Sequence, residues 1–175
     1  ARPVFSPDGS LIAIDIMDST AEDAWRSSGV DDLPNRVVIL EVETGEPEAV
    51  LEFPECTQVW APEWSPDGRQ LALSPGFSGG CERAGIADPL WIEVFDTDSW
   101  ESLGVISIPG DDAALRAIYL DDRRLGAFRS HNPLQVYDAV TFELVEVLEE
   151  VTSPVTPGVS IGGGLIATHS NETLL

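Results

Sequence analysis

The chain has 175 residues, of which 31 are acidic and nine are basic, and it carries a formal net charge of −22. A protein this acidic repels nucleic acid and anionic membrane surfaces, so the composition excludes both as partners. Hydrophobic residues make up 43% of the chain, but no apolar run reaches the length of a membrane span. We therefore expect one domain with a sizeable core and no membrane insertion.

The first element along the chain is a hairpin signal, FSPDGSLIA, from Phe5 to Ala13. Serine, proline and glycine suit the first, second and fourth positions of a type I turn, and aspartate tolerates the third and can bond nearby amides. The aromatic residue therefore ends one strand, and the apolar segment after the turn lies in the next. Nearly the same sequence, WSPDGRQLA, recurs from Trp64 to Ala72.

Two further copies of this hairpin signal lack the Ser-Pro-Asp-Gly sequence and are identified by the spacing of their residues. YLDDRRLGA runs from Tyr119 to Ala127, and VSIGGGLIA runs from Val159 to Ala167. Each copy has an apolar or aromatic residue, a turn, and an alanine eight positions after the first residue. We expect each alanine to let neighbouring sheets approach closely.

Between these hairpins lies a second motif, in which two β-rich strands flank a short turn of acidic or small residues. It starts at Val37, Leu90 and Leu134, and its flanks hold the β-branched and aromatic residues that pleated sheets favour. One repeat is therefore four strands, and four-stranded units of ~40–45 residues are typical of β-propeller blades. The sequence predicts an all-β fold of four-stranded antiparallel blades: blade 1 at about 5–64, blade 2 at about 64–119, blade 3 at about 119–159 and an incomplete blade 4 at about 159–175.

The aromatic residue, the Ser-Pro-Asp-Gly turn and the Leu/Ile-Ala strand together resemble the repeats of bacterial and archaeal WD-repeat-like and TolB-type propellers. The stretch EVFDTDSWESLGVISI, from Glu93 to Ile108, also resembles the YVTN-type repeats of bacterial surface propellers. The resemblance covers most of the chain. It implies a partial β-propeller of about three and a half blades, with protein partners in the cell envelope or outside the cell.

The predicted repeats begin near the end of a first strand and stop after a second strand. An open stack of blades exposes strand edges, which invite aggregation, and propellers close with ~4–8 blades. We therefore expect the chain to be a segment of a longer propeller, or a protein partner or neighbouring chains to cover its open edges.

The longest predicted loops all leave the blades at one face. They run from 18 to 35, from 74 to 89 and from 129 to 133, and insertions gathered on one face mark a functional surface. The candidate binding residues of this long-loop face are Asp18, Asp23, Trp25, Asp31, Asp32, Phe77, Glu82 and His131. Trp25 and Phe77 are candidate anchors for a protein partner, and the alternative is that both tuck under their own loops.

Two cysteines, Cys56 and Cys81, fall on the long-loop face of the same blade. A disulfide between them would pin the glycine-rich insertion of blade 2. It would also place the protein in an oxidising compartment, which is extracellular, at the cell surface or periplasmic. The alternative is two unpaired buried thiols.

Acidic residues crowd the same insertions, and calcium prefers carboxylate and carbonyl oxygens. The chain lacks the ordered spacing of a calcium loop, and His131 and His169 have no identifiable third ligand for a metal. We therefore predict a solvated acidic face with no metal site and no cofactor, and calcium at these carboxylates is the alternative.

The segment from Gly76 to Gly80 matches the G-x-S-x-G motif of α/β-hydrolases, but that motif works only between a strand and a helix. No amphipathic helix follows, so we predict no catalytic residue. The leading interpretation is a non-enzymatic interaction propeller that acts outside the cytoplasm through its long-loop face. One alternative is the propeller domain of an enzyme, either a prolyl-oligopeptidase-like peptidase or a hydrolase with Glu63 in its channel. Another is an acidic structural or surface-layer component.

Overall fold

The computed structural model describes residues 3–16, 36–53, 57–77, 90–108, 115–129, 132–152, 159–162 and 165–168. All secondary-structure elements assigned in this part of the chain are β-strands. This part of the chain contains no helix that is long and apolar enough to cross a membrane. The strands are β1 (Val4–Phe5), β2 (Leu11–Ile16), β3 (Arg36–Glu41), β4 (Pro47–Glu52), β5 (Thr57–Trp64), β6 (Gln70–Phe77), β7 (Leu90–Asp96), β8 (Ser102–Ile108), β9 (Leu115–Asp121), β10 (Arg124–Arg129), β11 (Pro133–Asp138), β12 (Leu144–Thr152), β13 (Val159–Gly162) and β14 (Leu165–Thr168).

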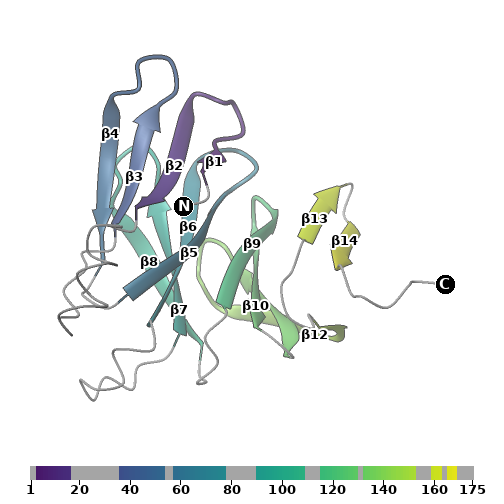
Figure 1. Cartoon of the computed structure of the whole chain (residues 1–175). Coiled ribbons are helices and arrows are strands. Elements are labelled where there is room, and N and C mark those ends of the chain that lie inside the picture. Colours follow the sequence, from purple (N-terminus) through teal and green to yellow (C-terminus); the bar gives the residue numbers. More distant parts are fainter. Residues whose placement is uncertain are drawn as a thin grey trace.

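These strands form three sheets of four antiparallel strands, in which neighbours along the chain pair with one another (Figure 1). We call the sheets blade 1 (β1–β4), blade 2 (β5–β8) and blade 3 (β9–β12), and β13 and β14 form a separate two-stranded sheet. The predicted all-β fold of four-stranded antiparallel units is confirmed.

Neighbouring blades pack face to face. Alternate side chains of a strand point to opposite sides of its sheet, so the side chains of one face can contact a neighbouring blade. In β7, Ile92 and Val94 are buried, whereas Glu93 between them is half-buried. Blades 1 and 2 share a core of Ala13, Val37, Ile39, Leu51, Phe53, Val59, Trp64, Leu71, Leu73 and Phe95. Blades 2 and 3 share a core of Ala72, Leu90, Ile92, Val94, Ile106, Ile108, Leu115, Ala117, Tyr119, Leu125, Ala127, Tyr137 and Ala139.

Contacts between blades run mainly through the inner strands. The strand β5 contacts β1 and β2 of blade 1, and β9 contacts β5, β6 and β7 of blade 2. The fourth strands, β4, β8 and β12, lie at the far edges of their sheets. The sheets therefore radiate from their first strands, as the blades of a propeller do.

The alanine of the second strand lies between blades in the first two repeats. Ala13 and Ala72 are fully buried, and each belongs to the core between its own blade and the next. This agrees with the expectation that a small side chain there lets neighbouring sheets approach closely.

In blade 3 the expected equivalence of Ala127 with those alanines is wrong. The pairing of Tyr119 with Leu125 shows that the turn of blade 3 is one residue shorter than that of blade 2. A slip of one residue moves a side chain to the other face of a sheet, and Ala127 consequently packs toward blade 2. The residue equivalent to the two buried alanines is Gly126, where an added methyl group would lie 2.9 Å from the nearest side chain.

Candidate functional site

Most of the predicted site residues lie outside the part of the chain that the structure describes. These are Asp18, Asp23, Trp25, Asp31, Asp32, Glu82 and His131, and the two cysteines, Cys56 and Cys81. Phe77 ends β6, and only its backbone is described. The residues of the long-loop face and the disulfide therefore stay predictions.

Two long connections leave the blades at one end. They join β2 to β3 through residues 17–35 and β6 to β7 through residues 78–89. Because the strands are antiparallel, these connections start at the end opposite to the turns between first and second strands. The turns that begin at Ser6 and Ser65 lie at that other end, which we call the short-turn face.

The two Ser-Pro-Asp-Gly turns have the same hydrogen bonds. The Ser65 hydroxyl donates to Oδ1 of Asp67 at 2.7 Å and accepts the backbone N–H of Gln70 at 2.9 Å. The Ser65 carbonyl accepts the N–H of Gly68 at 2.9 Å, and the φ of +74° at Gly68 favours glycine there. The turn at Ser6 repeats each of these bonds. The predicted turns are confirmed, and each serine side chain binds both the turn and the following strand.

Hydrogen bonds also hold the aspartate of the first turn in its ionised form. The Ser6 hydroxyl and the backbone N–H of Ser10 both donate to Asp8. These bonds favour the carboxylate and lower the pKa of Asp8 to about 2. Asp8 therefore stays charged at pH values where most carboxylates have become neutral.

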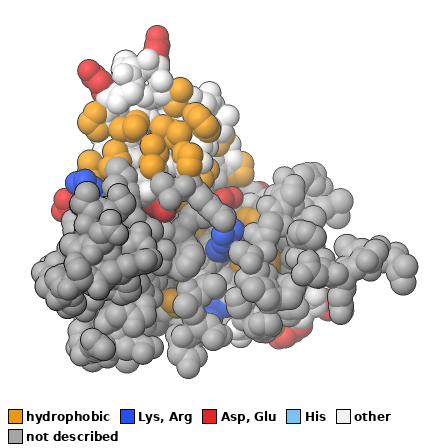
Figure 2. Space-filling model, viewed as in Figure 1, with side chains coloured by type: hydrophobic (Ala, Val, Ile, Leu, Met, Phe, Trp, Pro, Cys, Tyr) orange, Lys and Arg blue, Asp and Glu red, His pale blue; other side chains and the backbone are white. Residues whose placement is uncertain are grey.

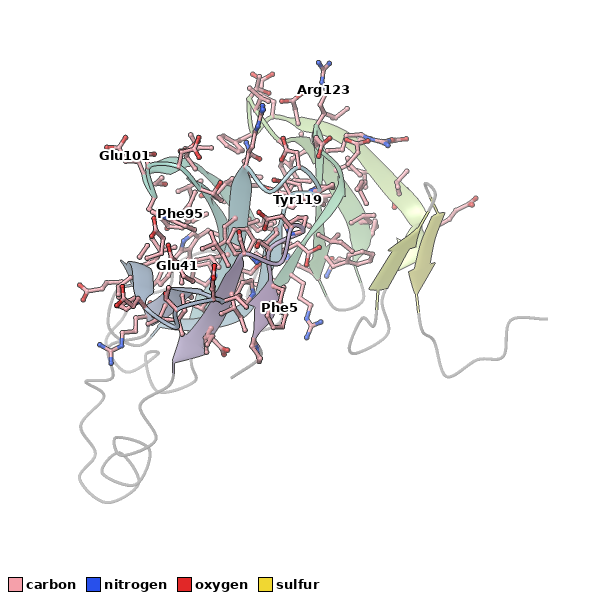
Figure 3. All side chains as sticks on the ribbon, turned by 90° about the horizontal axis from the view of Figure 1, so that it is seen from above. Phe5, Glu41, Phe95, Glu101, Tyr119 and Arg123 are labelled. Atoms are coloured by element: carbon pink, nitrogen blue, oxygen red, sulfur yellow. The ribbon has the colours of Figure 1, made fainter. Side chains whose placement is uncertain are left out.

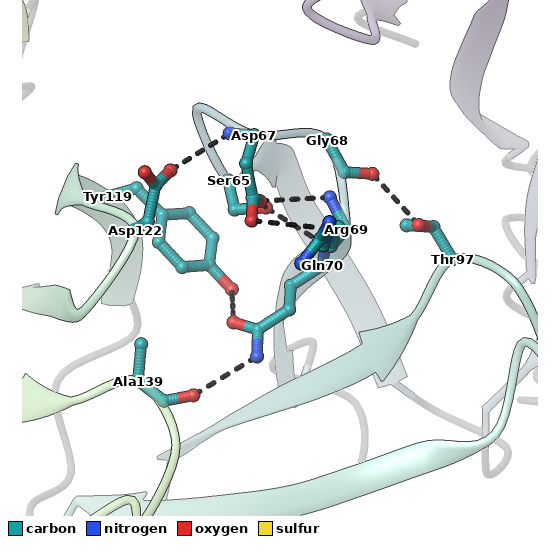
Figure 4. Close-up of polar contacts among 9 residues, drawn as sticks. All are labelled: Ser65, Asp67, Gly68, Arg69, Gln70, Thr97, Tyr119, Asp122 and Ala139. Atoms are coloured by element: carbon teal, nitrogen blue, oxygen red, sulfur yellow. Dashed lines mark hydrogen bonds and ion pairs between the residues drawn. The ribbon is translucent and has the colours of Figure 1, made fainter.

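Side-chain hydrogen bonds join the turns of blades 2 and 3 (Figure 4). The carboxylate of Asp122 accepts the N–H of Asp67 at 2.9 Å. The Tyr119 hydroxyl donates to Oε1 of Gln70 at 3.0 Å, and the Gln70 amide donates to the carbonyl of Ala139 at 3.2 Å. The short-turn face of blades 2 and 3 is thus held together across the interface.

Tryptophan supplies the corresponding contact between blades 1 and 2. Nε1 of Trp64 donates to the carbonyl of Val4 at 3.1 Å. Within blade 2, the ring of Trp64 meets that of Trp100 edge to face, with centroids 6.3 Å apart, a favoured geometry for aromatic pairs. Trp64 at the end of β5 and Tyr119 near the end of β9 therefore each bind the preceding blade.

A second aromatic residue of each of blades 2 and 3 lies in the turn before the fourth strand. Trp100 and Phe142, which we call the turn aromatics, have φ angles of 59° and 60°, a left-handed conformation that is costly for bulky residues. The carboxylates of Asp96 and Asp138 each accept two backbone N–H groups in these turns. These hydrogen bonds support the strained conformation.

The turn aromatics pack toward the preceding blade. A methyl group added to Gly104 in β8 would lie 2.5 Å from the ring of Phe142, so blade 3 contacts blade 2 there without space for a side chain. Trp100 packs against the core that blades 1 and 2 share. Blade 1 has Gly45 at the same turn position, with a φ of +70°. These contacts were not predicted from the sequence, although the stretches DTDSWE and DAVTFE recur at corresponding places in blades 2 and 3.

Glu63 is a half-buried carboxyl group on the innermost strand of blade 2. It follows a β-bulge in β5 and accepts the backbone N–H of Tyr119 in β9. Burial raises the pKa of Glu63 to about 7, against the opposing effects of that hydrogen bond and of the Arg116 charge. A carboxyl group with this pKa suits acid–base chemistry, but the structure places it between two blades, where it joins β5 to β9.

Two open depressions lie on the short-turn face, and half of the residues that line each of them are acidic. One is lined by Asp8, Gly9, Ser10, Leu11, Glu41, Val42, Glu43 and Glu48, and the other by Asp121, Asp122, Arg123, Arg124, Asp138 and Val145. Within the described ranges, no group of three or more His, Cys, Asp or Glu side chains is placed to hold a metal ion. The predicted acidic loops lie outside those ranges, so the prediction about calcium stays open.

Comparison with known proteins shows the fold. No protein-family model and no curated protein matches the chain, but solved structures do, among them WD40 repeats. A chain of the mitotic checkpoint complex matches 90% of this chain with a TM-score of 0.60 and 16% identity. The β-propeller domain of the Trilobed protease from Pyrococcus furiosus matches 91% (TM-score 0.57, 15% identity), and TolB from Acinetobacter baumannii matches 82% (TM-score 0.56, 17% identity).

The class of protein follows from these matches and from the three blades. The chain has the fold of a WD40- and TolB-like β-propeller, of which it holds three four-stranded blades and a further two-stranded sheet. It spans 38%, 44% and 31% of the lengths of the three matched chains named above. This chain is therefore a partial propeller.

Proposed function

We propose that the chain is part of a non-enzymatic β-propeller that binds a protein through its long-loop face, outside the cytoplasm. The observation that carries this proposal is the difference between the two ends of the blades. At the short-turn face, the turns are closed by their own hydrogen bonds and joined to one another. At the other end, two long connections start from the same sheets. Long loops on a rigid scaffold are where proteins place their binding residues.

Two aromatic residues in these connections are the proposed anchors. Trp25 lies between β2 and β3, and Phe77 ends β6 where the next connection begins. Aromatic side chains dominate the binding energy of many protein interfaces. The acidic residues around them, together with the net charge of −22, favour a partner with a basic surface because complementary charges speed association.

The matched structures provide precedents for this role and for its main alternative. One of them belongs to the mitotic checkpoint complex, an assembly of proteins. Another is the propeller domain of a protease, which is the precedent for the alternative that this chain belongs to an enzyme. We favour the interaction role because Glu63, the candidate channel carboxylate, is engaged between two blades.

The proposed location rests on the predicted disulfide between Cys56 and Cys81. Intact-mass measurement of the protein from its native source, before and after reduction, tests it. We expect reduction to add about 2 Da, because one disulfide becomes two thiols in a protein from an oxidising compartment. An unchanged mass would remove the support for a location outside the cytoplasm.

Site-specific photo-crosslinking tests the binding face directly. A benzophenone amino acid replaces Trp25 or Phe77 in the protein expressed in its native source. The matched control carries it at Val140, which is 69% exposed in a turn of the short-turn face. Because the anchors touch the partner, we expect one protein adduct from position 25 or 77 and none from position 140.

Two results would contradict the proposal. One is an adduct that forms only from position 140, which would move the interface to the short-turn face. The other is the absence of a protein adduct from both loop positions at expression levels where the control protein is folded. Loss of a measurable hydrolytic activity on Glu63→Gln would favour the enzyme alternative.

A further inference from the structure

The outermost strand of blade 3 is a free sheet edge. The order of this sheet is β12-β11-β10-β9, so in the described part of the chain β12 pairs with β11 alone. In Figure 3, Tyr119 of β9 lies toward the middle of the molecule, whereas the yellow-green strand β12 lies at its periphery. β12 has nine residues, against six in β4 and seven in β8. Such an edge presents backbone N–H and C=O groups with which a further strand can pair.

One face of β12 is apolar and exposed. Leu144 lies opposite Tyr137 and Val147 lies opposite Gln135, so both are turned toward blade 2, with which Tyr137 shares a core. Val145 is the extra residue of a β-bulge beside Leu144. We call Leu144, Val145 and Val147 the apolar strip, and their side chains are 53%, 62% and 38% exposed.

The apolar strip is exposed although a blade lies next to it. Figure 2 shows hydrophobic side chains gathered over blade 1, whose outer face has no neighbouring blade in the described part of the chain. The apolar strip differs from that surface, because blade 2 is present on its side. It stays exposed because the contacts between blades run mainly through the inner strands. Clustered apolar side chains that remain in water mark a contact site.

The other face of β12 is acidic. Glu146 lies opposite Val136, and therefore points away from the face of the apolar strip. It is exposed. Blades 1 and 2 have small residues at the same place, Ala49 and Gly104, as the strand pairings show. The ring of Phe142 occupies the space over Gly104. The exposed carboxylate of blade 3 therefore departs from the repeat.

We propose that β12 binds an extended segment of a partner protein, in which apolar residues alternate with lysine or arginine. The segment pairs with β12 as a fifth strand of blade 3. Because successive side chains of a strand point to opposite faces, its apolar residues lie beside the apolar strip and its basic residues lie beside Glu146. Main-chain hydrogen bonds provide the affinity, and the alternate side chains provide the specificity. This surface begins at Leu144, beyond the turn that holds Val140, and it is distinct from the long-loop face.

The charge of β12 favours this occupant over a second copy of the chain. The segment 143–152 has no basic residue and four exposed acidic ones, which are Glu143, Glu146, Glu149 and Glu150. Pairing of two β12 strands would bring the glutamates of two molecules together, each of net charge −22. Like charges on neighbouring strands are destabilising, and opposite charges are stabilising. The same glutamates that repel a second copy therefore attract a basic strand.

A synthetic peptide tests whether the edge accepts a strand. The probe is a fluorescent peptide as long as β12, in which lysine alternates with valine, and its binding to the full-length protein is followed by anisotropy. The control peptide carries a methyl group on every backbone nitrogen, so it keeps the charge but donates no N–H. Because the added strand donates to carbonyls of β12, we expect the methylated peptide to bind at least ~10-fold more weakly. Equal affinities, or no binding of the probe up to ~1 mM, overturn the proposal.

Hydrogen exchange and two matched variants measure where the peptide binds. With the probe bound, we expect slower amide exchange in β12 and unchanged exchange in the edge strands β4 and β8. Glu146→Lys and Glu48→Lys change the charge equally, and Glu48 is an exposed residue of β4. We expect Glu146→Lys to weaken binding by ~5-fold and Glu48→Lys by less than ~2-fold. Equal weakening by the two variants, or protection of β4 or β8 in place of β12, overturns the proposal.

Discussion

At the scale of single residues, the two tryptophans of the first interface use their indole N–H groups differently. Nε1 of Trp64 donates to the carbonyl of Val4. Nε1 of Trp100 is buried and has no hydrogen-bond partner in the described part of the chain. A buried donor without an acceptor opposes folding, so the contribution of Trp100 comes from its ring.

Replacing each tryptophan by phenylalanine separates these roles. We expect Trp64→Phe to lower the free energy of unfolding by about 1–3 kcal/mol, because it removes a hydrogen bond and buried volume. Trp100→Phe changes it by less than about 1 kcal/mol, since the lost N–H had no acceptor and Phe142 shows that the turn accommodates phenylalanine. Urea unfolding of the two variants checks the difference, and an equal or larger loss for Trp100→Phe would contradict the assignment.

Glu63 makes a pH-dependent contribution. Its pKa is raised from 4.5 to about 7, so the neutral form is favoured by folding. That stabilisation is present below about pH 4.5 and is lost as the pH rises through about 7. We expect Glu63→Gln to be more stable than the natural protein at pH 8 by about 1–3 kcal/mol, and not at pH 4.5. Urea unfolding at both pH values measures this, and a difference that is independent of pH would contradict it.

At the scale of elements, the turn of blade 3 packs directly on a strand of blade 2. We expect Gly104→Ala to lower the free energy of unfolding by about 1–3 kcal/mol, because the new methyl group would lie 2.5 Å from the ring of Phe142. In a Phe142→Ala background the same change costs much less, since the ring that it meets is gone. A double-mutant cycle measures the coupling between the two positions, and additive effects would show that they do not touch.

Turn chemistry was predictable from the sequence wherever the turn residues are specific. The hydrogen bonds of Ser6 and Ser65 follow from the side-chain and backbone preferences of the Ser-Pro-Asp-Gly turn. The position of Ala127 did not follow, because spacing alone does not reveal that the turn of blade 3 is one residue shorter. The turn aromatics were missed because a left-handed φ at Trp100 or Phe142 is a tertiary requirement that overrides the usual preference for glycine.

At the scale of the whole molecule, the four-stranded repeat was predictable because strand alternation and turn signals recur together along the chain. The packing of one blade on the next was predictable only in outline. The bonds of Gln70 to Tyr119 and Ala139 join three strands or turns that are far apart in the sequence, and no local pattern indicates them. The predicted long-loop residues lie outside the described ranges, so their arrangement remains a prediction.

The net charge of −22 makes the stability of the whole molecule dependent on salt. Repulsion between like charges destabilises the compact state, and the screening length falls from ~10 Å at 0.1 M to ~3 Å at 1 M ionic strength. We therefore expect Tm to rise between about 0.1 M and about 1 M potassium chloride. Thermal unfolding followed by circular dichroism checks this, and a Tm that stays constant or falls would show that repulsion does not limit stability.

Because the chain spans only 31–44% of the matched propeller chains, we expect its three blades to be part of a longer propeller formed by one polypeptide. The most direct test is the intact mass of the polypeptide that carries this sequence in its native source. We expect a mass well above the 18.8 kDa of the 175 residues. A polypeptide of about 18.8 kDa, whatever its state of association, would contradict this expectation.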